Sequence, residues 1–132
     1  MVENPSILIS DDDLGFRETL QHVFESQGFR TLLAGDGEEA LHIVEHEQVH
    51  LLLLDMHMPK LTGLEVLRMV RRFRALLPCI ILSAAADEAL MREAQLERAF
   101  SVLSKPVTRR QITITVAQAF ERTYNWRPAE RG

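Results

Sequence analysis

The chain has 132 residues, a net charge of −4 at pH 7 and a pI near 5.7. Its 46% hydrophobic and 26% charged residues are typical of one folded domain with its own core, and they exclude a disordered chain. The acidic balance argues against direct nucleic-acid binding, which needs a basic face, and no apolar run approaches the ~20 residues of a membrane span. Met1–Ser6 lack the pattern of a signal peptide and the one cysteine, Cys79, cannot form an internal disulfide, so we expect a cytoplasmic protein.

The first β-prone run, Ser6–Ser10, ends in three adjacent aspartates, Asp11, Asp12 and Asp13. Crowded carboxylates repel one another, and a bound cation is the usual remedy. Apolar residues then recur at helical spacing over residues 14–27, so Asp13 also suits the N-cap of this helix. Capping leaves the other two acids unexplained.

A second short strand is expected over Arg30–Ala34, and the turn at residues 35–37 opens a second helix. The pair Gly35-x-Gly37 resembles part of a nucleotide-binding loop. It lacks the third glycine and the phosphate-binding context, so a turn is the favoured interpretation.

Four consecutive leucines, Leu51–Leu54, indicate a strand buried on both faces, and Pro59 excludes a long helix there. Asp55 follows at the carboxyl end of this strand. Open parallel sheets bind ligands outside that end, but aspartate is also a common turn residue. The run alone leaves a reactive role and a capping role equally open.

A third helix is expected to open at residues 61–63, with an apolar face and a basic face. The basic face comprises Arg68, Arg71, Arg72 and Arg74. Such a face is most often solvated, although an acidic partner could dock on it.

The remaining chain continues the alternation of strands and helices. Strands are expected over Cys79–Leu82 and Phe100–Leu103, and helices over Asp87–Leu96 and about Thr108–Tyr124. Residues 112–116 alternate like a strand, but the apolar spacing and the helix formers that follow favour a helix.

This pattern predicts an α/β fold: a single doubly wound five-stranded parallel sheet with helices on both faces. The flavodoxin-like order 2-1-3-4-5 is expected, which brings all strand ends to one edge. We expect one domain over residues 1–124, followed at residues 125–132 by a tail or the start of a linker.

At that edge the strand-end residues are Asp11, Asp12, Asp55, Ser83 and Lys105. Three carboxylates suit Mg²⁺, a hard cation that prefers oxygen ligands. A lysine and a hydroxyl beside it would hold the oxygens of a phosphoryl group, and an aspartate can accept phosphate as an acyl phosphate. The set predicts phosphoryl transfer with Asp55 as the acceptor.

This set, with the stretches Ile7–Asp13, Leu54–Pro59 and Leu103–Pro106, resembles the receiver domain of bacterial two-component response regulators, the CheY-like family. The resemblance covers about residues 5–124. It implies a phosphorelay protein that takes a phosphoryl group from a sensor histidine kinase or a histidine phosphotransfer protein and switches the binding of an output protein or domain. It also implies no enzyme activity beyond Mg²⁺-dependent self-phosphorylation and autodephosphorylation.

The resemblance assigns a role to each matching position. Asp12 and Asp55 would ligate Mg²⁺ directly, Asp11 through water, and His57 through its backbone carbonyl. Asp55 would be phosphorylated, Ser83 would be the switch hydroxyl, Lys105 would pair with the phosphoryl oxygens, and the bond before Pro106 would be cis.

Three positions depart from the family pattern. Val102 replaces the usual switch aromatic, and Phe100 would share its face only if the strand is regular there. Arg98 replaces a glycine, which removes an easy left-handed turn. His50 replaces an acid before the third strand, and we expect a surface position for it.

Two other functions compete with this one. A receiver-like adapter would bind its partner without phosphorylation, and Mg²⁺ affinity would distinguish it. A phosphatase with an aspartate nucleophile would need a second acid where His57 stands, and a cap domain that the chain lacks. The kinase, the output and a possible homodimer through the last helix are left open.

Overall fold

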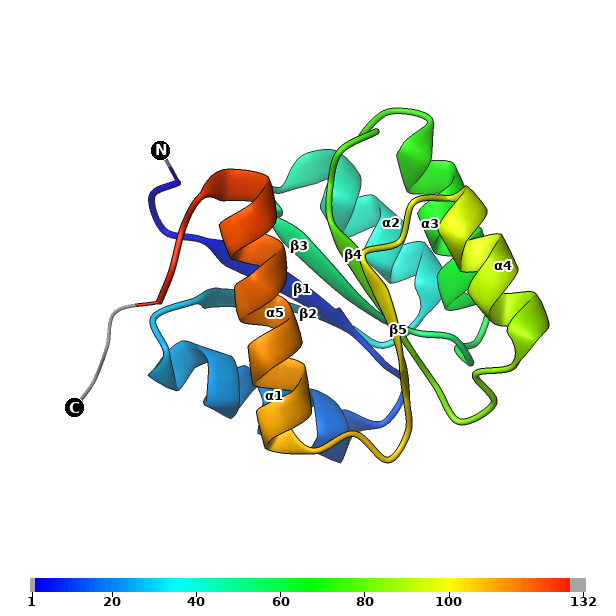
Figure 1. The fold of residues 1–132 in the computed structure, drawn as a ribbon, viewed down its shortest axis with the longest axis horizontal. Helices are drawn as coiled ribbons and strands as arrows, with labels where there is room; N and C mark the ends of the chain where they lie inside the picture. Colours follow the sequence, from blue (N-terminus) through cyan, green and yellow to red (C-terminus); the bar gives the residue numbers. More distant parts are fainter. Residues whose placement is uncertain (1, 129–132) are drawn as a thin grey trace.

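The computed structural model describes residues 2–128. The strands are β1 (Ser6–Ser10), β2 (Arg30–Ala34), β3 (Leu51–Asp55), β4 (Cys79–Ser83) and β5 (Ser101–Ser104). The helices are α1 (Leu14–Ser26), α2 (Gly37–His46), α3 (Gly63–Arg71), α4 (Glu88–Leu96) and α5 (Arg109–Tyr124), shown in Figure 1. The expected alternation is confirmed, including helix over residues 112–116. Within residues 2–128, no helix is both long and apolar enough to cross a membrane.

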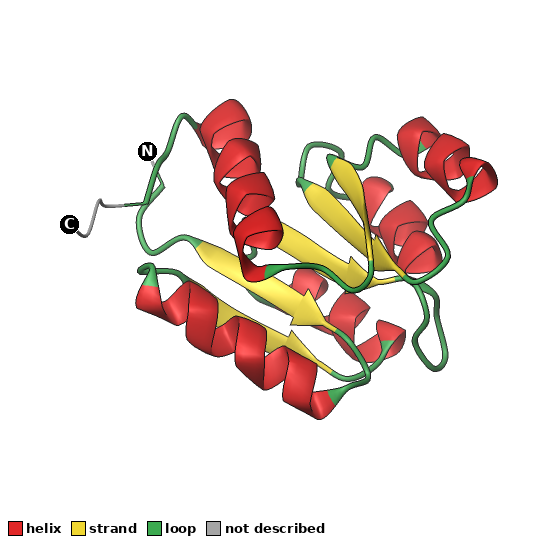
Figure 2. Cartoon of the chain, turned by 60° about the horizontal axis from the view of Figure 1, so that its bottom comes forward, coloured by secondary structure: helices red, strands yellow, loops and turns green. Residues whose placement is uncertain are grey.

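The sheet is parallel throughout and has the predicted order β2-β1-β3-β4-β5. At its carboxyl edge, Ser10 of β1 pairs with Ala34 on one side and Leu54 on the other. Asp55 pairs with Leu82 in β4. The strands therefore point the same way, as the arrows in Figure 2 show, and their last residues share one edge.

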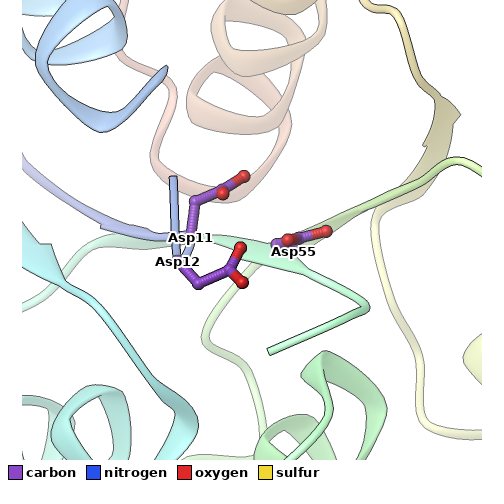
Figure 3. Close-up of side chains that lie close together, drawn as sticks. All are labelled: Asp11, Asp12 and Asp55. Carbon is purple, nitrogen blue, oxygen red and sulfur yellow. The ribbon is translucent and has the colours of Figure 1, made fainter. Parts of the chain in front are cut away.

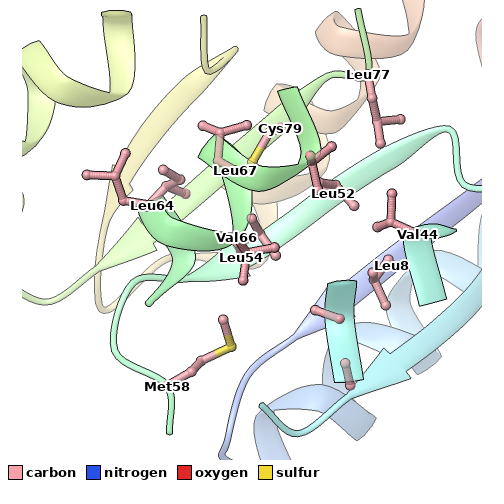
Figure 4. Packing of buried hydrophobic residues seen from close by; sticks show 14 of the residues in the cluster. Leu8, Val44, Leu52, Leu54, Met58, Leu64, Val66, Leu67, Leu77 and Cys79 are labelled. Atoms are coloured by element: carbon pink, nitrogen blue, oxygen red, sulfur yellow. The ribbon is translucent and has the colours of Figure 1, made fainter. Parts of the chain in front are cut away.

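Helices cover both faces of the sheet, as predicted. The core on the α1 and α5 face includes Ile7, Leu53 and Phe120. The core on the face of α2, α3 and α4 includes Leu52 and Leu54, which Figure 4 shows among other buried side chains of that cluster. Because neighbouring leucines of β3 point to opposite faces and both are buried, the strand needs a continuous apolar run.

Every helix begins at a side-chain cap that the local sequence encodes. The capping residues are Asp13, Asp36, Thr62, Asp87 and Thr108, each accepting a hydrogen bond from a backbone N–H in the first turn. The predicted capping role of Asp13 is confirmed. Caps of this kind set where each helix starts relative to the strand before it.

The basic residues in the last turn of α3 and just after it are not all solvated, which corrects the expectation for this face. Arg71 is half-buried and donates hydrogen bonds to the carbonyls of Glu97, Leu77 and Arg98. Arg74 donates to the carbonyl of Val49. Carbonyls at loop ends have no partners within a helix or strand, so these guanidinium groups satisfy them.

His50 is buried, with 8% of its surface exposed, so the expectation of a surface position is wrong. Its Nδ1 accepts a hydrogen bond of 2.9 Å from the backbone N–H of Ser6. The ring of Tyr124 packs edge-on against it, and the Tyr124 hydroxyl donates to the His50 carbonyl at 2.7 Å. Burial, with the nearby charge of Arg74, lowers the pKa of His50 below its usual 6.5.

The lowered pKa of His50 predicts a loss of stability in mild acid. Below about pH 6.5 the unfolded chain takes up a proton that the folded chain resists, because burial and the charge of Arg74 disfavour the charged imidazole. The free energy of unfolding should fall as the pH drops, until the folded histidine is also protonated. Urea unfolding at a series of pH values should show a steeper loss for the native chain than for His50→Asn. Equal slopes would contradict the prediction, and His22→Asn, at an exposed position, is the control.

The first residues after α5 pack onto the domain. Asn125 ends the helix in a left-handed conformation with φ of 53°. Trp126 then contacts the rings of Phe29 and Phe120, with centroids 5.0 and 5.3 Å apart. The segment expected to be a tail therefore begins against the core, while its residues 129–132 lie outside the described part of the chain.

Candidate functional site

Three carboxylates meet at the carboxyl edge of the sheet. Asp11 and Asp12 follow β1 and Asp55 ends β3, and Figure 3 shows their side chains close together. Each offers an oxygen within 4.8 Å of the others. Asp11 and Asp55 are 1% and 4% exposed, whereas Asp12 is exposed to solvent. The group is therefore buried on one side and open on the other.

Lys105 bridges the two buried acids. Its Nζ lies 2.9 Å from Oδ2 of Asp11 and 3.2 Å from Oδ1 of Asp55. The backbone N–H of Lys105 donates to the carbonyl of Ser83 at 2.9 Å, which holds the lysine beside the end of β4. The peptide bond between Lys105 and Pro106 is cis.

The electrostatics of the site follow from this crowding. Burial and the charge of Asp11 raise the pKa of Asp55 above its usual value, against the opposing effect of Lys105. Burial lowers the pKa of Lys105, but its bond to Asp11 and the two negative charges outweigh this effect and raise the pKa overall. The lysine therefore stays positively charged, and its single charge does not balance the negative charges of the three carboxylates.

Local hydrogen bonds position the acids. Oδ1 of Asp11 accepts from the backbone N–H of Asp13 at 2.9 Å, so the turn after β1 orients the buried carboxylate. The guanidinium of Arg17 donates to the Asp11 carbonyl. Sequence reasoning missed Arg17, because an arginine in the first turns of a helix carries no signal of its target.

The loop after β3 is held close to the strand by Gly63. The N–H of this glycine donates to the Met56 carbonyl at 3.1 Å. A Cβ at Gly63 would lie 2.6 Å from the carbonyl oxygen of Asp55, a distance that real Cβ atoms do not tolerate. Sequence reasoning placed Gly63 at a helix start but missed this role.

His57 and Ser83 reach the same edge by different contacts. The backbone N–H of His57 donates to Oδ1 of Asp55 at 3.4 Å, and its imidazole is exposed. Ser83 is buried, and its Oγ accepts from the N–H of Ala85 at 3.1 Å. Ser83 and His57 line a shallow depression with Met56. Ser83 therefore adjoins the acids without the direct contact that Lys105 makes.

The structure shows how Val102 and Arg98, which depart from the family pattern, are accommodated. Val102 packs against the core on the α4 side, whereas Phe100 packs against the core on the α5 side, beneath Arg122. Phe100 precedes β5 and does not share the face of Val102. Arg98 takes the left-handed conformation with φ of 58°, so the expected loss of this turn is wrong: its backbone carbonyl is bonded by Arg71 there.

The donors at this edge fit a hard divalent cation. All three side chains offer carboxylate oxygens, and one of them is accessible to solvent, so bound water could complete the shell. Burial, and then the charge of Asp11, raises the pKa of Asp55, and a bound cation would favour the charged form of this carboxyl. Among residues 2–128, no other group of three acidic, histidine or cysteine side chains meets this geometry.

The fold and this edge define a doubly wound α/β domain with an acidic site at the carboxyl ends of its strands. The family described as response regulator receiver domain matches residues 7–117, and the chain belongs to this family. Receiver domains bind Mg²⁺ at an acidic pocket, and Asp11, Asp12 and Asp55 form such a cluster here.

The chain matches most of the length of one relative in this family and only half of the length of another. The chain is 35% identical over 103 residues to sporulation initiation phosphotransferase F of Bacillus subtilis. This match covers 78% of this chain and 83% of that protein. It is also 34% identical over 121 residues to the alkaline phosphatase synthesis transcriptional regulatory protein PhoP of the same organism. This match covers 91% of this chain. The chain spans only 50% of the length of PhoP.

A solved complex provides a structural relative. The CheX–CheY–BeF₃–Mg²⁺ complex from Borrelia burgdorferi contains a chain that matches with a TM-score of 0.81 and 29% identity. The match covers 88% of this chain and 89% of that one.

Proposed function

We propose that the chain is a phosphoacceptor receiver that takes a phosphoryl group on Asp55 with Mg²⁺ and thereby switches the binding of a partner. The observation that carries this proposal is the convergence of three carboxylates at one edge of the sheet, where Lys105 contacts both Asp11 and Asp55. A relative named as a phosphotransferase and a relative solved with Mg²⁺ and BeF₃ support it.

Each residue of the site would have its own role in Mg²⁺ binding and phosphoryl transfer. Asp12 and Asp55 would hold Mg²⁺ directly, Asp11 through water, and His57 through its backbone carbonyl. When bound, Mg²⁺ would shield the incoming phosphoryl group from the acids. A carboxylate oxygen of Asp55 attacks phosphorus, the bond to the donor breaks, and an acyl phosphate forms. Lys105 would then move its ammonium toward the phosphoryl oxygens.

The switch would begin at Ser83. Phosphorylation adds about 1.5 to 2 negative charges beside its hydroxyl. In the present structure that hydroxyl accepts from the N–H of Ala85. Rotation of the Ser83 side chain toward a phosphoryl oxygen, to which its O–H would donate, would take Oγ away from this N–H and rearrange the loop between β4 and α4. A partner that prefers one arrangement of this loop would sense the phosphate.

The biological setting is proposed on the same grounds. A sensor histidine kinase or a histidine phosphotransfer protein would supply the phosphoryl group, and an output protein or domain would respond, in the cytoplasm. The chain would itself catalyse only this transfer and its hydrolysis. We propose residues 1–124 as the receiver domain, with Trp126 packed onto it at the start of a tail or linker.

The intact mass after incubation with acetyl phosphate tests the proposal. With Mg²⁺ the native chain should gain the mass of one phosphoryl group, and with EDTA it should gain none. The absence of an adduct in a chain shown to bind Mg²⁺ would contradict the proposal and favour the phosphorylation-independent adapter.

Replacing Lys105 with alanine should change metal binding and phosphorylation in opposite directions. The ammonium ion repels Mg²⁺ and occupies oxygens of Asp11 and Asp55, so its removal should tighten Mg²⁺ binding by up to about tenfold. Phosphorylation should slow by about a hundredfold, because a positive charge that stabilises the transferring group is lost. Calorimetry and the rate of adduct formation measure the two effects. A parallel fall in both would show that the site had collapsed.

A further inference from the structure

A histidine pair on α2 lies apart from the acidic site. His42 and His46 are four residues apart, so they occupy the same face of the helix, which is cyan in Figure 1. Both side chains are exposed. Their ring centroids are 4.2 Å apart and their planes differ by 34°. The two imidazoles are therefore neighbours on an open surface.

The hydrogen bonding of His46 leaves one ring nitrogen free to bind a metal. Its Nδ1 lies 2.8 Å from the backbone carbonyl of His42. A carbonyl only accepts, so Nδ1 carries the proton and the neutral ring keeps its lone pair on Nε2. Metal-binding histidines are commonly oriented in this way: the second ring N–H donates a hydrogen bond to a carbonyl.

The charge around the pair favours a cation. Residues 37–48 contain four glutamates and no lysine or arginine. Lys60 lies 3.7 Å from Glu38 and Arg30 lies 3.7 Å from Glu47, toward the two ends of the helix. Glu45 stands beside His46, which gives the spacing His-x-x-Glu-His. Helices of zinc enzymes use two histidines at this spacing as ligands.

We propose that His42 and His46 form a binding site for a borderline-soft divalent cation such as Zn²⁺, Ni²⁺ or Cu²⁺. Imidazole suits these metals, whereas Mg²⁺ prefers oxygen ligands. Within residues 2–128, His42 and His46 do not belong to a group of three candidate ligands, so water would complete the coordination. The site thus binds metal and lacks the third protein ligand of a hydrolytic zinc centre.

Retention of the untagged chain on a resin that carries Zn²⁺ or Ni²⁺ tests this site. The native chain should be retained and eluted by imidazole. His42→Ala and His46→Ala should each lose retention, and calorimetry should show Zn²⁺ affinity reduced by at least about tenfold, because the second ligand no longer acts at high effective concentration. His22→Ala, which removes an exposed histidine from α1, is the matched control and should behave as native.

Three results would overturn the proposal. These are no retention of the native chain, unchanged retention of either pair variant, and loss of Zn²⁺ binding in Asp12→Asn, which would assign the cation to the acidic site. Far-ultraviolet circular dichroism of each variant shows that the helices are intact. Phosphorylation of Asp55 is measured separately, so failure of the histidine site leaves the proposed function unaffected.

Discussion

Replacing Asp55 with asparagine is expected to abolish the phosphoryl adduct completely. An amide oxygen is a poor nucleophile and cannot form the acyl phosphate, whereas the other two acids remain in place. The fold should not be lost. Burial, and then the charge of Asp11, raises the pKa of this carboxyl, so a neutral side chain relieves both, which offsets the loss of the ion pair with Lys105. Intact mass after acetyl phosphate treatment with Mg²⁺ is the measurement.

The matched control for this variant is Asp13→Asn. Asp13 belongs to the same run of acids but caps α1 through an oxygen that asparagine also provides. It should be phosphorylated at the native rate. The native adduct should also be released by hydroxylamine, as an acyl phosphate is. An adduct that persists in Asp55→Asn would place the phosphate on another side chain and would refute the assignment of the acceptor.

Replacing Gly63 with alanine should damage both stability and phosphorylation. The added methyl group would meet the backbone carbonyl of Asp55 at 2.6 Å and lie 3.3 Å from Cβ of Leu54. Neither neighbour is a flexible side-chain end, so α3 must shift away from β3. Overpacking of this kind costs about 1–3 kcal/mol. Because the shift starts at Asp55, the proposed acceptor, adduct formation should slow in the fraction that stays folded.

Gly15→Ala is the control for the effect of a methyl group on a helix. A Cβ at Gly15 would meet only Oδ1 of Asp13, at 3.4 Å, and the residue lies within α1. This variant should match or exceed the native stability, since alanine is favoured over glycine in helices by about 0.5–1 kcal/mol. Urea unfolding midpoints measure both variants. Equal midpoints for Gly63→Ala and Gly15→Ala would show that the close approach has no energetic cost.

The structure limits which segments can change conformation in response to a phosphate on Asp55. Val102 has no ring to swing between two positions, and Phe100 cannot replace it because its side chain packs on the opposite face of the sheet. The element left to respond is the loop after β4, where Ser83 is held by the N–H of Ala85. We therefore expect the backbone after Ser83 to be the main difference between the free and phosphorylated states.

Much of the fold followed from short-range patterns. The leucine run of β3 is apolar because it is covered on both faces, and each helix starts at a capping residue beside its own first turn. The prediction from residue type was wrong at one turn, because Arg98 adopts the left-handed conformation that was expected of glycine. The surrounding contacts, including the bond from Arg71 to its carbonyl, outweigh the local preference of the residue.

By itself, the sequence determined the strand order and the acidic edge, since alternating strands and helices admit few topologies and parallel strands end at one edge. Only the tertiary structure decided which of these groups touch. Lys105 bonds to Asp11 from 94 residues away, and the Tyr124 hydroxyl bonds to the His50 carbonyl across 74 residues. Local periodicity carries no information about such pairs, because their geometry depends on how the helices pack on the sheet.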